Sequence, residues 1–169
     1  MLSVTRAAIV AAAAFVPMLL EASRSRRNEA LLRARGAVEP PGDVHAWMQI
    51  VYPGCFVAIV VEAALRRQPA GAGAIAGAVI FLLAKALKYW AIAALGDRWS
   101  FRVLVLPGEP LVTKGPYQWL RHPNYVGVAG ELIGAAVMAG SPVTGVIAFV
   151  AFGGMMLARI RVEERALNI

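Results

Sequence analysis

Five apolar stretches alternate with short polar segments along the chain. The first three cover residues 7–20, 46–65 and 70–84, and the third continues past two lysines to residue 95. Two further stretches, residues 126–139 and 143–158, lie on either side of a Gly-Ser-Pro sequence. Because about 20 apolar residues are needed to cross a bilayer as a helix, the pattern predicts an all-α integral membrane protein with about five transmembrane helices. The last two should form a helical hairpin.

The first stretch has an alternative interpretation. An alanine-rich apolar core that follows Arg6 also has about the length found in a cleaved signal peptide. Residues 17–21 contain no clean small-residue cleavage site, however, and the chain beyond them is itself apolar enough for a membrane. A first transmembrane helix is therefore preferred. The lone cysteine, Cys55, lies within an apolar stretch and is predicted to be a buried packing residue.

Composition supports the membrane class, and the positions of the charges predict an orientation. Hydrophobic residues make up 59% of the chain and charged residues 16%, whereas soluble domains have about 25% charged residues. The net charge is +7, and the arginine clusters follow the first, third and fifth spans, so five spans place them on one side. The positive-inside rule assigns that side to the cytoplasm. This predicts a bacterial inner-membrane protein with its N-terminus outside and its C-terminus cytoplasmic. Because topology accounts for the clusters and they form no single basic face, nucleic acid is not expected as a partner.

The chain is predicted to form one domain, residues 1–169. Residues 1–95 contribute three N-terminal transmembrane helices, and residues 96–169 contribute a loop, the helical hairpin and a C-terminal helix. The glycine- and alanine-rich segment 71–78 should let helices approach closely. Residues 21–35 are predicted to extend the first helix, supported by ion pairs among Glu21, Arg24, Glu29 and Arg33 at helical spacing.

The extended polar loop ends in the sequence GPYQWLRHPNY, residues 115–125. Pro123 favours the first turn of a helix, and the free N–H groups of a helix N-terminus attract a carboxylate or phosphate. With Arg121, His122 and Tyr125, this start of a helix is a candidate anion pocket. The alternative is an aromatic belt, in which the same side chains and Trp119 only anchor the helix at the lipid headgroups.

Two groups outside the loop favour the pocket. Glu131 lies within the fourth apolar stretch, where an unpaired carboxylate costs about 3 kcal/mol and is a functional candidate. Arg159 and Glu163 share one helical face, with Glu164 adjacent, and a hairpin would return that face to the loop. An ordinary solvated helix end with ion pairs is the alternative for this C-terminal group.

These segments together resemble a known family. Residues 111–128 read LVTKGPYQWLRHPNYVGV, and residues 159–167 read RIRVEERAL. The two runs, with Glu131 and the glycine-proline hairpin between them, resemble the isoprenylcysteine carboxyl methyltransferase family and its phospholipid methyltransferase relatives over residues 95–167. The run RWSFRV, residues 98–103, is also similar to bacterial members.

The resemblance implies methyl transfer from S-adenosylmethionine by a membrane-embedded enzyme without a Rossmann domain and without a metal. It implies that His122 and Tyr125 contact the carboxylate end of the cofactor, and that Glu163 holds its other polar groups. It places Arg159 at the reactive centre, and Glu131 or His122 could serve as the base for a neutral acceptor. The full cofactor set so implied is Leu111, Val112, Tyr117, Arg121, His122, Pro123, Tyr125, Glu163 and Glu164.

The acceptor remains open at this stage. The family implies a lipophilic small molecule methylated on a carboxylate or hydroxyl oxygen, either an isoprenylcysteine-like compound or a long-chain polyketide pyrone or phenol, with membrane lipids as surroundings. A phospholipid N-methyltransferase is the second choice. An NADPH-dependent enzyme of the sterol-reductase kind and a noncatalytic scaffold are the alternatives outside the class, and the oligomeric state is undetermined.

Overall fold

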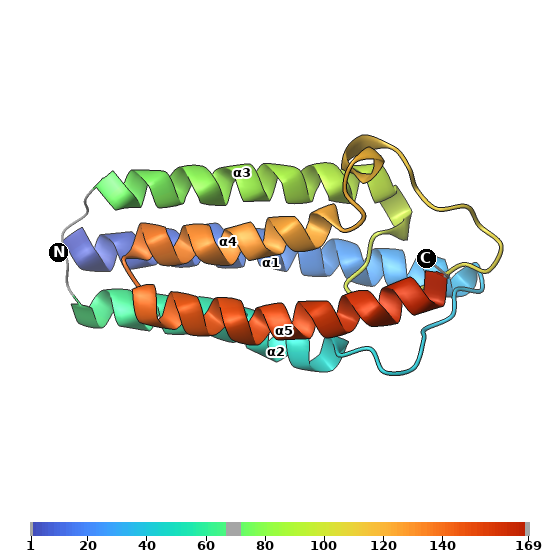
Figure 1. Ribbon diagram of the computed structural model, residues 1–169, viewed down its shortest axis with the longest axis horizontal. Coiled ribbons are helices and arrows are strands. Elements are labelled where there is room, and N and C mark those ends of the chain that lie inside the picture. The colour runs from blue at the N-terminus through green and yellow to red at the C-terminus, as the bar shows by residue number, and fades with distance from the viewer. Residues whose placement is uncertain (1, 67–71, 168–169) are drawn as a thin grey trace.

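Five long helices run along one common axis in the computed structural model (Figure 1). The structure describes residues 2–66 and 72–167, for residues 2–4 and 6 the backbone alone. The helices are α1 (Leu2–Ala34), α2 (His45–Arg66), α3 (Ala72–Leu95), α4 (Pro123–Ala139) and α5 (Pro142–Leu167). In the described residues, β pairing is limited to an isolated bridge between Val38 and Val105. The predicted all-α fold is confirmed.

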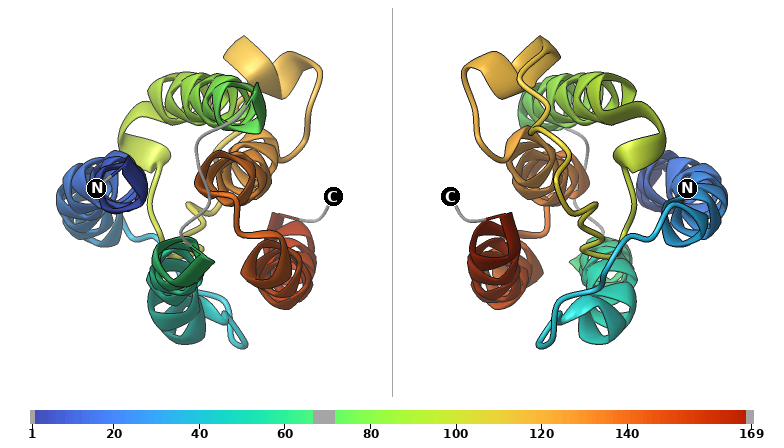
Figure 2. Two further views of the ribbon diagram at one scale, coloured as in Figure 1. Left: turned by 90° about the vertical axis from the view of Figure 1, so that its left-hand side faces the viewer. Right: turned by 90° about the vertical axis from the view of Figure 1, so that its right-hand side faces the viewer.

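Four helices are individually long and apolar enough to cross a membrane, namely α1, α2, α3 and α5. The fifth, α4, has 17 residues and a length of about 25 Å, at the lower end of the range for a span. It contacts each of the other four helices and lies among them in the end-on views (Figure 2). The protein is therefore an integral membrane protein built around a short inner helix.

The arginine-rich segments gather at one end of the bundle. The C-terminal part of α1, the loop between α3 and α4, and the C-terminal end of α5 all lie there (Figure 1). At about 50 Å, the 33 residues of α1 exceed a hydrocarbon core of about 30 Å, so α1 extends well past the membrane core. The shared end agrees with the charge pattern, and the assignment of that end to the cytoplasm stays a prediction.

Glycines allow α3 and α4 to approach closely. Gly127, Gly130 and Gly134 of α4 face α3, and a β-carbon on Gly134 would stand 2.5 Å from the backbone nitrogen of Phe81. A β-carbon on Gly77 of α3 would likewise collide with the backbone of Met138. This confirms the close approach predicted for the small residues that the structure describes; Gly71 lies outside the described residues.

A methyl group at position 134 should therefore push the two helices apart. We expect Gly134→Ala to lower the free energy of unfolding in detergent by about 1–3 kcal/mol, the usual cost of overpacking a core. Gly153→Ala is the matched control, because nothing lies within 4 Å of a β-carbon there. Equal thermal stability of the two variants would contradict the tight α3–α4 contact.

The extension of α1 supports the polar loop. Asn28 donates hydrogen bonds to the carbonyl oxygens of Gly96 at 3.1 Å and Trp99 at 2.8 Å. The Ser25 hydroxyl accepts the backbone N–H of Phe101 at 2.7 Å. These buried contacts fix the beginning of the loop on α1, because an unmet polar group there would be costly.

The helical ion pairs predicted on α1 are wrong. Glu21 pairs with lysines of α3, Glu29 pairs with Arg102 at 3.5 Å, and Arg33 pairs with Glu39 at 2.5 Å. Each charge reaches a partner outside its own helix because the loops fold back over α1. Two Arg neighbours, Arg33 and Arg102, outweigh burial and lower the pKa of Glu39.

The hairpin between α4 and α5 forms as predicted. Gly140 closes α4 with a φ of 72°, in the left-handed region that glycine favours. The buried Ser141 hydroxyl donates to the carbonyl oxygen of Ile59 at 2.8 Å, and Pro142 begins α5. Glu62 of α2 accepts the backbone N–H of Thr144 at 2.7 Å, which caps α5 and ties it to α2.

Candidate active site

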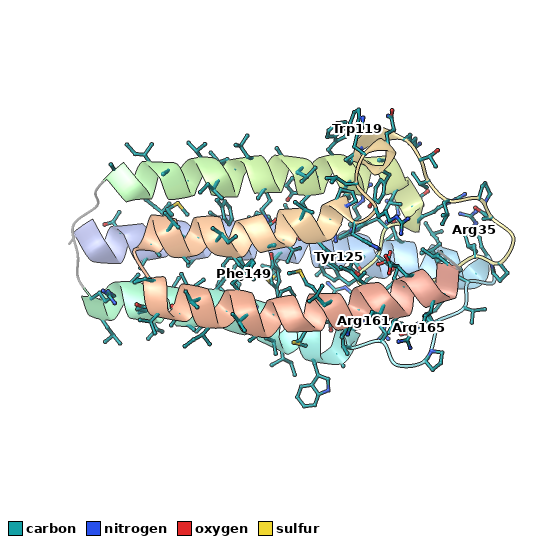
Figure 3. All side chains as sticks on the ribbon, in the orientation of Figure 1. Arg35, Trp119, Tyr125, Phe149, Arg161 and Arg165 are labelled. Atoms are coloured by element: carbon teal, nitrogen blue, oxygen red, sulfur yellow. The ribbon has the colours of Figure 1, made fainter. Side chains whose placement is uncertain are left out.

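The polar loop delivers its aromatic residues to two different places. A short 3₁₀ turn, η2 (Gly115–Gln118), precedes His122, and buried Pro123 begins α4 as predicted. Trp119 is 70% exposed, lies 5.8 Å from the Trp90 ring, and projects outward (Figure 3). Tyr125 instead lies between α4 and α5 (Figure 3). The belt interpretation thus suits Trp119, and the pocket interpretation suits Tyr125.

The two groups of candidate residues meet directly. The Tyr125 hydroxyl donates to Glu163 at 2.9 Å and accepts a hydrogen bond from Nε of Arg159 at 2.8 Å. The His122 ring lies 3.1 Å from an oxygen of Glu164 and 3.7 Å from one of Glu163. The hairpin therefore places the C-terminal face of α5 against the first turn of α4, as the sequence predicted.

Arg159 occupies a buried position within this group. Only 7% of the residue is exposed, and its guanidinium donates to the carbonyl oxygen of Phe101. Its charge is met by Asp43 at 3.4 Å. Asp43 also accepts the backbone N–H groups of His45 and Val103, both at 3.1 Å.

Asp43 is a site residue that the sequence analysis missed. It stands just before α2, where an aspartate is a common helix-start signal, and its bond to the His45 N–H matches that role. The signal was present in the sequence. Its second function, as the partner of Arg159, depends on the loop from α3 to α4 folding over the start of α2.

A cavity of about 450 Å³ opens beside these residues, within the range of small-molecule sites. Helices α1 and α2 add an apolar wall that includes Met18, Leu19, Met48 and Tyr52. The predicted residues that line the cavity are Leu111, Val112, Tyr117, Arg121, His122, Tyr125, Arg159 and Glu163. Pro123, Glu131 and Glu164 lie behind this lining rather than in it.

Tyr117 contributes a neutral phenol to the cavity wall. Burial, together with the negative charge of Glu163, raises the pKa of Tyr117 well above its usual range. The phenol therefore stays protonated at physiological pH and can donate a hydrogen bond. Tyr117 is suited to binding, not to accepting a proton.

A buried charge cluster, Glu21, Lys85, Lys88 and Glu131, lies behind the cavity at the centre of the bundle. Lys88 lies 2.6 Å from Glu21 and 3.3 Å from Glu131. Lys85 lies 3.5 Å from Glu21 and 3.1 Å from Glu131. Two carboxylates thus face two ammonium groups, which compensates charges that the membrane interior would otherwise disfavour.

Glu131 is therefore engaged on the side away from Arg159. Its carboxylate also accepts the Tyr52 hydroxyl at 2.5 Å, and Tyr52 and Lys88 stand between it and the cavity. The sequence analysis noted both lysines within the third apolar stretch but assigned them no partner. Two lysines three residues apart in an apolar helix, with carboxylates in two other spans, were the available signal.

Comparison with known proteins agrees with this arrangement. A sequence model described as "Isoprenylcysteine carboxyl methyltransferase (ICMT) family" matches residues 77–169. The chain is 31% identical over 149 residues to an uncharacterized protein, YpbQ, of Bacillus subtilis, with 88% of each chain covered. It is 24% identical over 147 residues to an uncharacterized protein of Haemophilus influenzae, with 86% of each covered. No solved structure matches.

Proposed function

We propose, since the chain belongs to the isoprenylcysteine carboxyl methyltransferase family, that it is a membrane methyltransferase using S-adenosylmethionine to methylate a lipophilic acceptor. The observation that carries the proposal is the contact among Tyr125, Arg159 and Glu163 at the wall of the cavity. Three groups from both halves of the hairpin converge where a cofactor and an acceptor could meet.

The charges of the site suit a cationic cofactor. Three carboxylates, from Asp43, Glu163 and Glu164, accompany the guanidinium groups of Arg121 and Arg159. An excess of negative charge favours a ligand that carries a sulfonium and an ammonium group. When bound, S-adenosylmethionine supplies an electrophilic methyl group attached to a sulfonium sulfur.

The chain's residues divide the binding task. His122 and exposed Arg121, at the N-terminus of α4, suit the carboxylate of the cofactor, and Glu163 suits its ammonium group. Leu111, Val112 and the neutral Tyr117 offer a flat and apolar enclosure for the adenosyl portion. Pro123 and Glu164 contribute by fixing the helix start and the His122 ring.

The acceptor side of the cavity is apolar. Met18 and Leu19 of α1, with Met48 of α2 and Phe152 of α5, line it, which supports a lipophilic tail entering from the membrane. Arg159 is placed to orient an acceptor oxygen, and alignment with exclusion of water is the main requirement for an in-line displacement. An isoprenylcysteine-like carboxylate and the hydroxyl of a long-chain pyrone or phenol both satisfy this description.

Thermal unfolding in detergent tests the cofactor. S-adenosylmethionine should raise the unfolding temperature of the purified protein through preferential binding to the folded state, whereas NADPH should not. A shift with NADPH and none with S-adenosylmethionine would overturn the proposal in favour of a reductase. Mass spectrometry of lipid extracts incubated with labelled S-adenosylmethionine would then identify the acceptor, phospholipid amines included.

Removal of polar groups at the cofactor end should weaken binding. We expect His122→Ala and Glu163→Gln each to raise the dissociation constant for S-adenosylmethionine about tenfold, the loss typical of one charge-assisted hydrogen bond. Isothermal titration calorimetry measures this change. Arg165→Ala is the control, because Arg165 is exposed near the end of α5 (Figure 3). Wild-type affinity in His122→Ala would show that the pocket assignment is wrong.

Cysteine labelling tests the orientation. Lys114 is exposed in the polar loop and Arg66 is exposed at the other end of the bundle. In intact cells, Arg66→Cys should react with an impermeant maleimide, whereas Lys114→Cys should react only after permeabilisation. The buried Cys55 supplies the background control. The reverse pattern would place the site outside, away from the cytoplasmic cofactor.

A further inference from the structure

A histidine that the proposed function does not use lies in the wall of the same cavity. His45 is the first residue of α2, is 5% exposed, and lines the cavity with Arg159. The chain has two histidines, and the other, His122, is held by Glu163 and Glu164 at the cofactor end. His45 is thus the histidine on the α2 side of Arg159.

The carbonyl oxygen of Phe101 connects His45 with Arg159. The imidazole hydrogen-bonds the backbone of Phe101, and the Arg159 guanidinium donates to the same residue's carbonyl oxygen. Two side chains bonded to one peptide group lie close to each other. The acceptor oxygen that Arg159 orients is therefore within the neighbourhood of the His45 ring.

This carbonyl also fixes the form of the imidazole. A neutral histidine has one N–H donor and one acceptor nitrogen, and a bond to a carbonyl selects which nitrogen carries the proton. With one ring nitrogen donating to Phe101, the other is left as an acceptor. A ring oriented in this way is the arrangement required of a general base.

We propose that His45 is the general base of the methyl transfer and that the acceptor is a neutral hydroxyl group, phenolic or enolic, on a lipophilic molecule. This inference rests on the proposed function. In the step, the hydroxyl oxygen forms a bond to the methyl carbon while the bond from that carbon to sulfur breaks, leaving its electron pair on sulfur. The hydroxyl proton moves to the free nitrogen of His45 and is later released to water.

The other titratable groups fit this division poorly as bases. Glu131 lies behind Tyr52 and Lys88 with its oxygens engaged. Asp43 accepts two backbone N–H groups and faces Arg159, contacts that stabilise the ionised carboxylate. The charged groups acting on the His45 ring are Asp43 beside it, Arg102 of the polar loop and Arg159 of α5.

His45→Gln separates the base from the fold, since glutamine can still donate a hydrogen bond to Phe101 but cannot take a proton. With a long-chain 5-alkylresorcinol as the probe, we expect kcat at neutral pH to fall by about 100-fold or more, with unchanged affinity for S-adenosylmethionine. The fall of the rate at acidic pH seen in the wild type should disappear, and the variant's rate should instead rise with pH as the phenol itself ionises.

A spectroscopic measurement on the protein without cofactor gives an independent readout. With isotope-labelled histidine, one of the two imidazoles should show a single neutral tautomer whose signals vanish in His45→Gln and persist in His122→Gln. Addition of the 5-alkylresorcinol should shift its unprotonated nitrogen.

The outcomes distinguish the two proposals. Failure of the wild type to bind S-adenosylmethionine would overturn the proposed function. Cofactor binding and transfer by the wild type, with an unchanged kcat and pH profile in His45→Gln, would overturn only the assignment of His45. An averaged tautomer that the resorcinol does not shift would also overturn that assignment.

Discussion

Arg159→Gln is expected to lower kcat for methyl transfer by about 100- to 1,000-fold, the loss found when one preorganised donor to the reacting oxygen is removed. The dissociation constant for S-adenosylmethionine should stay near the wild-type value, because the cofactor contacts are assigned to His122 and Glu163. Single-turnover kinetics with the cofactor saturating measures the effect. The reason is positional: Tyr125 and Phe101 hold the guanidinium at the cavity wall.

Loss of Arg159 also leaves Asp43 without its cation, so stability must be separated from chemistry. The double variant Arg159→Gln/Asp43→Asn should recover much of the lost stability, because no unpaired buried charge remains, but it should not recover kcat. Arg161→Gln is the matched control, since Arg161 is exposed two positions along α5 and projects outward (Figure 3). Recovery of turnover in the double variant would show that Arg159 matters only for folding.

Glu131→Ala is expected to give the largest loss of stability among single substitutions in the bundle. Removing one carboxylate leaves two buried ammonium groups facing Glu21 alone, and breaking a buried ion pair costs about 3–5 kcal/mol. Thermal unfolding in detergent should show this loss. Tyr52→Phe should cost only about 1 kcal/mol, because it removes a single hydrogen bond to Glu131.

Glu109→Ala is the comparison for an exposed carboxylate. Glu109 is 32% exposed and pairs with Arg35 and Arg98 at the far end of the polar loop, where such pairs contribute about 1 kcal/mol or less. If Glu131→Ala unfolded like Glu109→Ala yet abolished turnover, Glu131 would act in the chemistry, as the sequence alone suggested, and not in the charge cluster.

The fold was largely predictable, and the reason is periodic apolar length. Bilayer thickness ties span length to residue count, so the positions of all five helices followed from the apolar stretches. Proline and glycine marked the hairpin correctly, at Gly140 and Pro142. The ion pairs on α1 failed because helical spacing describes an isolated helix, whereas Glu29 and Arg33 lie under a loop that offers other partners.

The site was predictable only where its residues share a motif or a helix face. Tyr125 and Glu163 were brought together by the hairpin, which the sequence reveals. Asp43 and His45 were not, because they belong to a different loop and helix, and their relation to Arg159 is made by a backbone carbonyl of Phe101 that carries no residue-type signal. Tertiary contacts of this kind are invisible to any one-dimensional pattern.

The support of the polar loop by α1 has a consequence for exchanging parts between relatives. The family match begins at residue 77, yet the loop rests on Ser25 and Asn28, and Arg159 is neutralised by Asp43. A chimera that joins the C-terminal half of one relative to the N-terminal helices of another would separate these matched surfaces. Acceptor preference is therefore a property of the complementary halves together, and we expect it to be inherited only when both come from one parent.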